Sequence, residues 1–411
     1  MRMLRRICLV LALTLLLGTL PARAAEATLL PLEPEVPAFA DLAGSRFAPC
    51  AQTVCRAGLM QGKAAGRFDA SSSLTWAQCM AVSARLHNRL QGGTGDIPLL
   101  QDAAWYLAYY NYMAPLLNYS SGTEMEDSGF QPDAPCTRIG FAALISTVLR
   151  SAGIRLPAVN ETAGIPDLDP MEAGSSYDDV LELYRAGVLT GFDAYGSFRA
   201  FETLNRGQAA AILARLVDPA QRSTQTPASF DLIRDLLHAD PDAIVYTVNG
   251  SAVTLRTFAS LLAEHFFTGS DPAESASYAE AALRRCAGID ALAQAHGVTL
   301  SADAQAEAEA AAARCAGFAG LTQEAWLVRR QQMALEAAVR SWYVDTYGAP
   351  LSPLFQTDSP DGVSRMLDDL SAAEAAAALT STGYLEGLDW ASITRDAAAT
   401  PYARYFFQKA V

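Results

Sequence analysis

The sequence is poor in the residues that metal centres and nucleic-acid interfaces need. Its 411 residues include only four His, at scattered positions, and only two of its 30 basic residues are Lys. Acidic residues outnumber basic ones by 44 to 30 and no basic run is present, which argues against DNA or RNA as the main partner. Scattered histidines disfavour a His-rich metal centre and limit general-base chemistry. We therefore expect no metal, no cofactor and no nucleic-acid partner.

The sequence also lacks the motifs of common enzymes and any long apolar run after its first residues. We find no G-x-S-x-G, H-E-x-x-H, Walker, G-x-G-x-x-G or EF-hand pattern. Residues 1–24 combine early arginines, an apolar run from Ile7 to Leu17 and the small-x-small sequence Ala22-Arg23-Ala24. That run is too short to span a bilayer comfortably, so the pattern predicts a cleaved signal peptide and an exported protein without a membrane anchor.

Six cysteines follow the predicted signal peptide: Cys50, Cys55, Cys79, Cys136, Cys286 and Cys315. An even number in an exported chain permits disulfides without proving them. Cys286 and Cys315 lie on successive predicted helices, so they are candidates for a disulfide across a helical hairpin. The alternative is that both are buried thiols, which behave as small apolar side chains. No cysteine spacing suits zinc.

Three segments of the N-terminal half share one pattern: a helix, a turn stopped by Gly, a short extended segment containing Phe, and a second helix. In each, the Phe precedes the start of the second helix by eight residues: Phe68 to Trp76, Phe130 to Arg138 and Phe198 to Arg206. Thr75, Thr137 and Asn205 stand directly before these helices, where an N-cap residue belongs. The regular spacing indicates repeated structural units.

Other positions of the pattern recur in the first and third segments. These are the opening sequences Phe39-Ala-Asp41-Leu42 and Ile165-Pro-Asp167-Leu168, and the glycine pairs Gly58/Gly62 and Gly187/Gly191. The set resembles the S-layer homology family, whose pattern is Phe-x-Asp, Gly-[Ile/Leu/Val]-x-x-Gly, Phe-x-Pro and Ile-Thr-Arg-Ala-Glu. The three repeats would span residues 38–92, 97–152 (a degenerate copy) and 163–217.

This resemblance implies a pseudo-threefold helical trimer whose grooves hold the anionic secondary polysaccharide of a bacterial cell wall. The arginine of the Thr-Arg motif contributes to that site, and a guanidinium at a helix N-terminus suits an anion. Trp76 takes its place in the first repeat. The polymer-binding residues implied are Arg138, Arg206, Thr137, Asn205, Trp76 and Gly191. The alternative is that the arginines only cap and solvate helices.

Residues 218–229 are polar, contain two Pro and predict a linker. A β-rich run then meets Asn249-Gly250, a strong hairpin signal, and helices follow to about Gly348. Val248-Asn-Gly-Ser-Ala-Val-Thr254 and Ala293-Gln-Ala-His-Gly-Val-Thr-Leu-Ser301 resemble the N-terminal chaperone domain of SurA- and PrsA-type peptidyl-prolyl isomerases. We place that domain at residues 230–348.

The second resemblance implies a cleft that holds unfolded exported polypeptides. Its lining by analogy would be Phe258, Leu262, Phe266, Trp326 and Met333, although these can equally be plain core residues. The family's catalytic parvulin domain needs a pair of His, and residues 349–411 contain none and are too few. We expect this C-terminal extension to be a remnant at most, so that isomerase activity is absent.

The sequence thus predicts a mainly α protein: a three-repeat S-layer homology trimer plus a separate α-helical, chaperone-like domain with a short β-hairpin. The expected function is non-covalent attachment to the secondary polysaccharide of the cell wall, at the cell surface, with the second domain binding exported polypeptides. Two alternatives remain. One is a structural envelope protein whose C-terminal half only mediates assembly, and the other is a degenerate peptidyl-prolyl isomerase.

Overall fold

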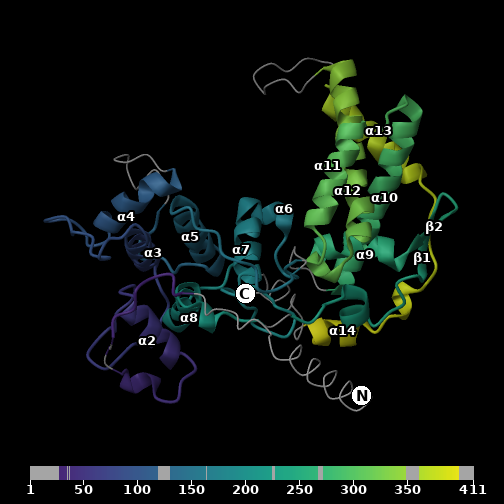
Figure 1. The fold of residues 1–411 in the computed structure, drawn as a ribbon. Helices are drawn as coiled ribbons and strands as arrows, with labels where there is room; N and C mark the ends of the chain where they lie inside the picture. Colours follow the sequence, from purple (N-terminus) through teal and green to yellow (C-terminus); the bar gives the residue numbers. More distant parts are fainter. Residues whose placement is uncertain are drawn as a thin grey trace, which may run out of the picture. The chain divides into compact units, whose positions relative to one another are not determined.

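The computed structural model describes residues 27–34, 36, 38–118, 130–162, 164–224, 227–266, 272–348 and 361–397 (Figure 1). The predicted signal peptide lies outside these ranges. The described residues are mainly helical and include one small antiparallel sheet, which confirms the expected fold class. Within these ranges, no helix combines the length and the apolar character that crossing a bilayer requires.

The chain divides into two compact units, which we describe separately. The first draws its residues from Met1–Pro157, Ala186–Val188 and Thr203–Thr224. The second draws them from Ala158–Arg185, Leu189–Glu202 and Gln225–Val411. The predicted third repeat is therefore shared: its second helix belongs to the first unit, and its front part belongs to the second.

The first unit is a set of short helices joined by turns. They are η1 (Ala40–Leu42), α2 (Ala48–Arg56), α3 (Trp76–Leu90), α4 (Leu107–Met113), η2 (Ala114–Leu117), α5 (Arg138–Ser151), α8 (Arg206–Val217) and η3 (Pro219–Gln221). Helix α3 packs against both α4 and α5, and α2 packs against α8 although the two are far apart in sequence. The first and third repeats therefore meet through helices from opposite ends of the unit.

The segments that precede α3, α5 and α8 hydrogen-bond to one another in a closed ring. The N–H of Leu74 donates to the carbonyl of Leu204, that of Leu204 to Cys136, and that of Cys136 to Leu74, each at 2.9 Å. All three residues are buried and each stands directly before an N-cap. Three equivalent bonds that close on themselves give the first unit a pseudo-threefold centre, as three equivalent repeats would.

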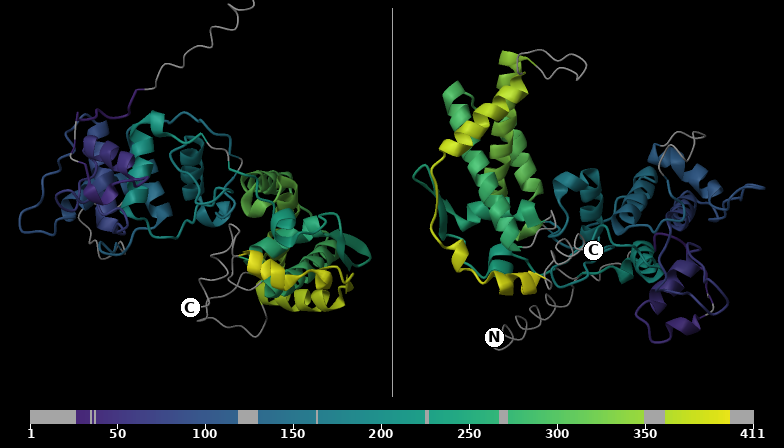
Figure 2. Two further views of the ribbon diagram at one scale, coloured as in Figure 1. Left: turned by 90° about the horizontal axis from the view of Figure 1, so that it is seen from below. Right: turned by 180° about the vertical axis from the view of Figure 1, so that it is seen from behind.

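The second unit contains the longer helices and the sheet. Its elements are α6 (Pro170–Ala173), α7 (Ser175–Arg185), the π-helix η4 (Leu232–Leu237), β1 (Ile244–Val248), β2 (Ser251–Thr254), α9 (Leu255–Phe266), α10 (Pro272–His296), α11 (Ala302–Arg314), η5 (Phe318–Gly320), α12 (Gln323–Tyr347), α13 (Gly362–Ala376), β3 (Leu379–Ser381), η6 (Leu385–Gly387) and α14 (Trp390–Ala397). Helix α12 packs against α10, α11 and α13 (Figure 1), and Figure 2 shows α13, in yellow, lying against these green helices.

The predicted hairpin is present. Strands β1 and β2 pair around Asn249 and Gly250, which both have positive φ, as a tight two-residue hairpin turn requires. Strand β3, from the far end of the chain, pairs with the other edge of β1 and gives the order β2-β1-β3. Asn249 in the hairpin turn bonds to Ala378, the residue directly before β3. The Asn249 N–H donates to Ala378 O, and Asn249 Oδ1 accepts from the N–H of Ala378, both at 2.9 Å.

The front part of the third repeat packs with the C-terminal helices of the second unit. Ala319 N–H donates to Pro166 O at 3.0 Å, and the Arg314 guanidinium binds Asp178 at 3.1 Å. The predicted linker is packed where it is described, because Ala228 N–H donates to Ala194 O at 2.7 Å. The described residues of this segment are divided between the two units, with 218–224 in the first and 227–229 in the second.

Candidate functional site

Two of the residues predicted to bind the wall polymer, Thr137 and Asn205, are N-caps of helices. The side chains of Thr75, Thr137 and Asn205 cap α3, α5 and α8 by accepting hydrogen bonds from Gln78, Gly140 and Gln208 N–H groups. At α3 and α8 the backbone N–H groups of the first two helical residues also have hydrogen-bond acceptors. At α3, Trp76 donates to Ala134 O and Ala77 donates to Pro132 O. At α8, Arg206 donates to Ser72 O and Gly207 donates to Ala70 O. Each of these carbonyls belongs to the neighbouring repeat, so these helix starts do not offer those N–H groups to an anion.

Arg206 is a buried inter-repeat contact. Only 8% of it is exposed, its Nε donates to Phe68 O at 3.0 Å, and its Nη2 donates to Gln61 O at 2.6 Å. Its guanidinium also lies over the Phe68 ring. Burial lowers the pKa of this side chain. Arg138 is buried to a similar extent. The two arginines thus lie inside the first unit, which favours a mainly structural role.

Trp76 and Gly191 lie in close contacts within their own units. The Trp76 ring lies against Gly140 so closely that any Cβ at position 140 would collide with it. Gly191 lies against the backbone of Gly196, and a Cβ there would collide too. Both glycines are therefore required by packing, whatever else these positions do.

An accessible aromatic group occurs at a place that the sequence pattern did not indicate. Trp105 is 46% exposed and makes edge contacts with Tyr106 and Tyr109. Arg85 lies over the Tyr109 ring and donates to its hydroxyl at 3.0 Å. We call Arg85, Trp105, Tyr106 and Tyr109 the aromatic patch. The run of aromatics at positions 105–110 is its sequence signal, but only the fold adds an arginine from α3.

The residues predicted to line a client cleft are mostly core. Phe258, Leu262 and Trp326 are fully buried, and the Trp326 indole N–H donates to Phe318 O at 3.2 Å. These three do not line an open cleft, because neighbouring helices cover them; this corrects the analogy. Met333 is 41% exposed, and the Phe266 side chain lies outside the described residues.

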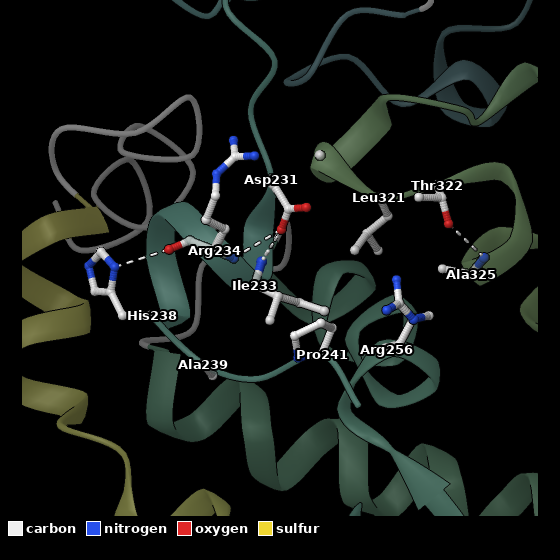
Figure 3. A pocket seen from close by; sticks show the side chains of 11 residues that line it. Asp231, Ile233, Arg234, His238, Ala239, Pro241, Arg256, Leu321, Thr322 and Ala325 are labelled. Carbon is white, nitrogen blue, oxygen red and sulfur yellow. Dashed lines mark hydrogen bonds between the residues drawn. The ribbon is translucent and has the colours of Figure 1, made fainter. Parts of the chain in front are cut away.

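Two cavities open in the second unit instead. The first, of about 450 Å³, lies beside the π-helix η4 (Figure 3). Its charged groups already have partners: Asp231 accepts from the N–H groups of Ile233 and Arg234, Arg234 pairs with Asp235 at 2.6 Å, and Arg256 pairs with Asp242 at 3.0 Å. These bonds shape the turn before the sheet and define no reactive group.

The second cavity, of about 370 Å³, lies between the β1–β2 hairpin, α9, α10 and α12; we call it the hairpin cavity. Val253, Leu261 and Val328 contribute apolar surface. Gln332 donates to both carboxylate oxygens of Asp290, at 3.0 and 3.2 Å. Gln332 Oε1 is buried and accepts no hydrogen bond from any described residue. Burial raises the pKa of Asp290.

The Cys286–Cys315 disulfide that the sequence allowed is not formed in the structure, where all six described cysteines are free thiols. Cys315 is buried and accepts from Arg330 Nη2 at 3.3 Å, whereas Cys286 lines the hairpin cavity, where burial raises its pKa to about 11. A thiol with such a pKa is a poor nucleophile at neutral pH. The two residues lie on successive helices as predicted, but their side chains have different neighbours.

Among the residues that the structure describes, no three His, Cys, Asp or Glu side chains gather as a metal site would require. No family model and no curated protein matches this chain. The functional argument therefore depends on the repeats, the aromatic patch and the hairpin cavity.

Proposed function

We propose that this is an exported protein that binds an anionic cell-wall polysaccharide non-covalently through its three repeats. The observation that supports this most is the closed ring of hydrogen bonds through Leu74, Cys136 and Leu204, since it relates three repeats by pseudo-threefold symmetry. The proposal includes no catalysis.

The aromatic patch is the part of the first unit best suited to touch the polymer. Trp105 offers an exposed, rigid ring, and the half-buried Arg85 guanidinium lies over the neighbouring Tyr109 ring, which is itself buried. Aromatic and arginine side chains together supply large contact area at low entropic cost, with charge for an acidic group. Both Arg85 and Arg206 donate two hydrogen bonds within the unit, but Arg206 is only 8% exposed whereas Arg85 is half-buried, so Arg206 is the less direct contact.

Co-sedimentation tests this proposal. The chain from residue 25 on should pellet with purified Gram-positive-type cell wall and should stay in solution when the secondary polysaccharide has been stripped. Trp105→Ala should weaken binding by about tenfold, the effect of losing about 1.4 kcal/mol. Phe201→Ala is the matched control, because Phe201 is 60% exposed and lies outside the patch. If the chain binds stripped and intact wall equally, or binds neither, the polysaccharide is not its ligand.

We further propose that the second unit binds extended segments of exported polypeptides in the hairpin cavity. Gln332 lines the cavity, and its buried Oε1 has no donor among the described residues, which is costly. A rotation of this side chain toward the cavity would let a peptide N–H satisfy the acceptor. The apolar side chains of the same cavity suit the alternate side chains of an extended chain.

A holding assay tests the cavity. Val328 is 41% exposed and lines it, so Val328→Asp places a charge in the cavity without disturbing the core. We expect this variant to lose suppression of aggregation of a reduced, alkylated model protein. Leu367→Asp, at an exposed position on α13, should keep it. If the wild-type chain binds cell wall but suppresses no aggregation, the structural envelope role replaces this one.

A further inference from the structure

Two buried cysteines lie side by side where the second repeat joins the first. Cys136 N–H donates to Leu74 O at 2.9 Å, and Trp76 N–H donates to Ala134 O at 3.0 Å. These bonds hold the residue before α5 against the first turn of α3, which contains Cys79. Both cysteines have no exposed surface. Both are free thiols in the structure, and the Cys136 thiol donates to Thr137 O at 3.5 Å. Burial, together with the neighbouring Cys136 thiol, raises the pKa of Cys79.

The repeats themselves provide an internal comparison for this pair. Cys136 stands directly before its N-cap, as Leu74 and Leu204 do, and Cys79 stands four residues after its N-cap, as Phe141 and Ala209 do. The ring of backbone bonds makes three equivalent junctions. By position in the repeat, the counterparts of Cys136 and Cys79 are Leu74 and Ala209 at one junction and Leu204 and Phe141 at the other.

All six of these residues are buried. A single cysteine at such a position is explained as a small apolar side chain. Here both members of one pair are cysteine, while both members of the other two pairs are apolar. Only the junction between the first and second repeats has a cysteine at both positions.

We propose that Cys79 and Cys136 form a disulfide in the exported protein, linking the first and second repeats. The proposal uses the export that the proposed function includes, because disulfides persist in oxidising compartments. The two thiols lose two protons and two electrons as the S–S bond forms. A disulfide oxidant accepts them by thiol–disulfide exchange and leaves as two thiols.

Because neither cysteine is exposed, the exchange takes place before the two repeats close on each other. The bond would join residues 57 positions apart and so restrict the unfolded chain strongly. It would leave Cys286 and Cys315 as thiols.

Peptide mapping tests the disulfide. The chain from residue 25 on is refolded in a glutathione buffer with the oxidised form in excess, denatured, alkylated and digested. We expect one cross-linked peptide pair containing Cys79 and Cys136, with Cys286 and Cys315 alkylated. Cys79→Ala should leave Cys136 alkylated, and the control Cys286→Ala should keep the cross-link. Alkylation of both Cys79 and Cys136 in the wild-type chain, or a cross-link to another cysteine, would overturn the proposal.

A second measurement separates the bond from its surroundings. Reductant should lower the melting temperature of the wild-type chain and leave that of the Cys79→Ala, Cys136→Ala double variant unchanged. An equal response of the two would contradict the link. Neither readout involves cell wall or polypeptide, so failure of the proposed binding functions leaves this result interpretable.

Discussion

Asp41 and Asp167 accept the same two backbone hydrogen bonds in different surroundings. Asp41 accepts from the N–H groups of Phe68 and Asp69 at 2.9 and 2.7 Å. Asp167 accepts from those of Phe198 and Arg199 at 2.7 and 2.8 Å. The bonds to Phe68 and Asp69 lower the pKa of Asp41, whereas burial raises the pKa of Asp167 to about 6 against the same kind of bonds. The pKa of the carboxyl group at this repeat position is thus lowered in the first repeat and raised in the third.

This difference predicts the pH dependence of stability. Since the folded pKa of Asp167 is above its unfolded value near 3.9, its contribution is full below about pH 4 and is lost as pH rises through about 6. Relative to Asp167→Asn, the wild-type free energy of unfolding should therefore fall by up to about 3 kcal/mol between pH 4 and pH 7. Urea unfolding at four pH values measures it.

Asp41→Asn is the matched control and should respond with the opposite sign. The depressed pKa of Asp41 gives stability that is present above its unfolded pKa and lost as pH falls. A difference between wild type and Asp167→Asn that stays constant from pH 4 to pH 7 would contradict the burial argument.

At the scale of elements, α7 belongs with the C-terminal helices although its sequence belongs to the repeats. Tyr177 is 1% exposed. Near the start of α7, Gly174 O and Asp178 both accept from Arg314 at the end of α11. Ring contacts between Tyr195 and Phe230 continue this packing beyond the predicted linker. A boundary at residue 217 therefore cuts through a packed unit.

We predict that a chain of residues 25–217 loses ordered α7. Hydrogen exchange should show amides 175–185 losing at least tenfold of their protection relative to the chain of residues 25–397. The amides of α3 should stay protected, because their partners α4 and α5 are retained. Equal protection of α7 in both chains would mean that the repeats order it unaided.

At the scale of the whole molecule, the charge and the placement of polar groups constrain the partners. The net charge of −14 makes a general attraction to anionic polymers unfavourable, so an acidic polysaccharide must be held by a few local arginines. Because Arg138 and Arg206 are buried, fewer arginines of the first unit can reach such a polymer, and Arg85 becomes the more important candidate. In the second unit, a polypeptide needs no such cation, and the hairpin cavity offers hydrogen-bond acceptors and apolar walls.

Features determined by the local chain could be read from the sequence. The N-cap positions of Thr75 and Thr137, the positive φ of Gly58, and the Asn249–Gly250 turn depend on neighbours within a few residues. Their chemistry restricts the backbone directly, through capping hydrogen bonds or through the absence of a Cβ. The mainly helical class follows from the same local patterns.

The tertiary structure alone decided which side chains are accessible and which meet. Arg206 has the motif position of a ligand-binding arginine, but a turn of the first repeat covers it. Phe258 and Trp326 have the apolar character that a cleft or a core equally requires, and packing assigned them to the core. Cys79 and Cys136 became neighbours through a ring of hydrogen bonds between distant segments. Burial and juxtaposition are sums over the whole fold, which no local pattern encodes.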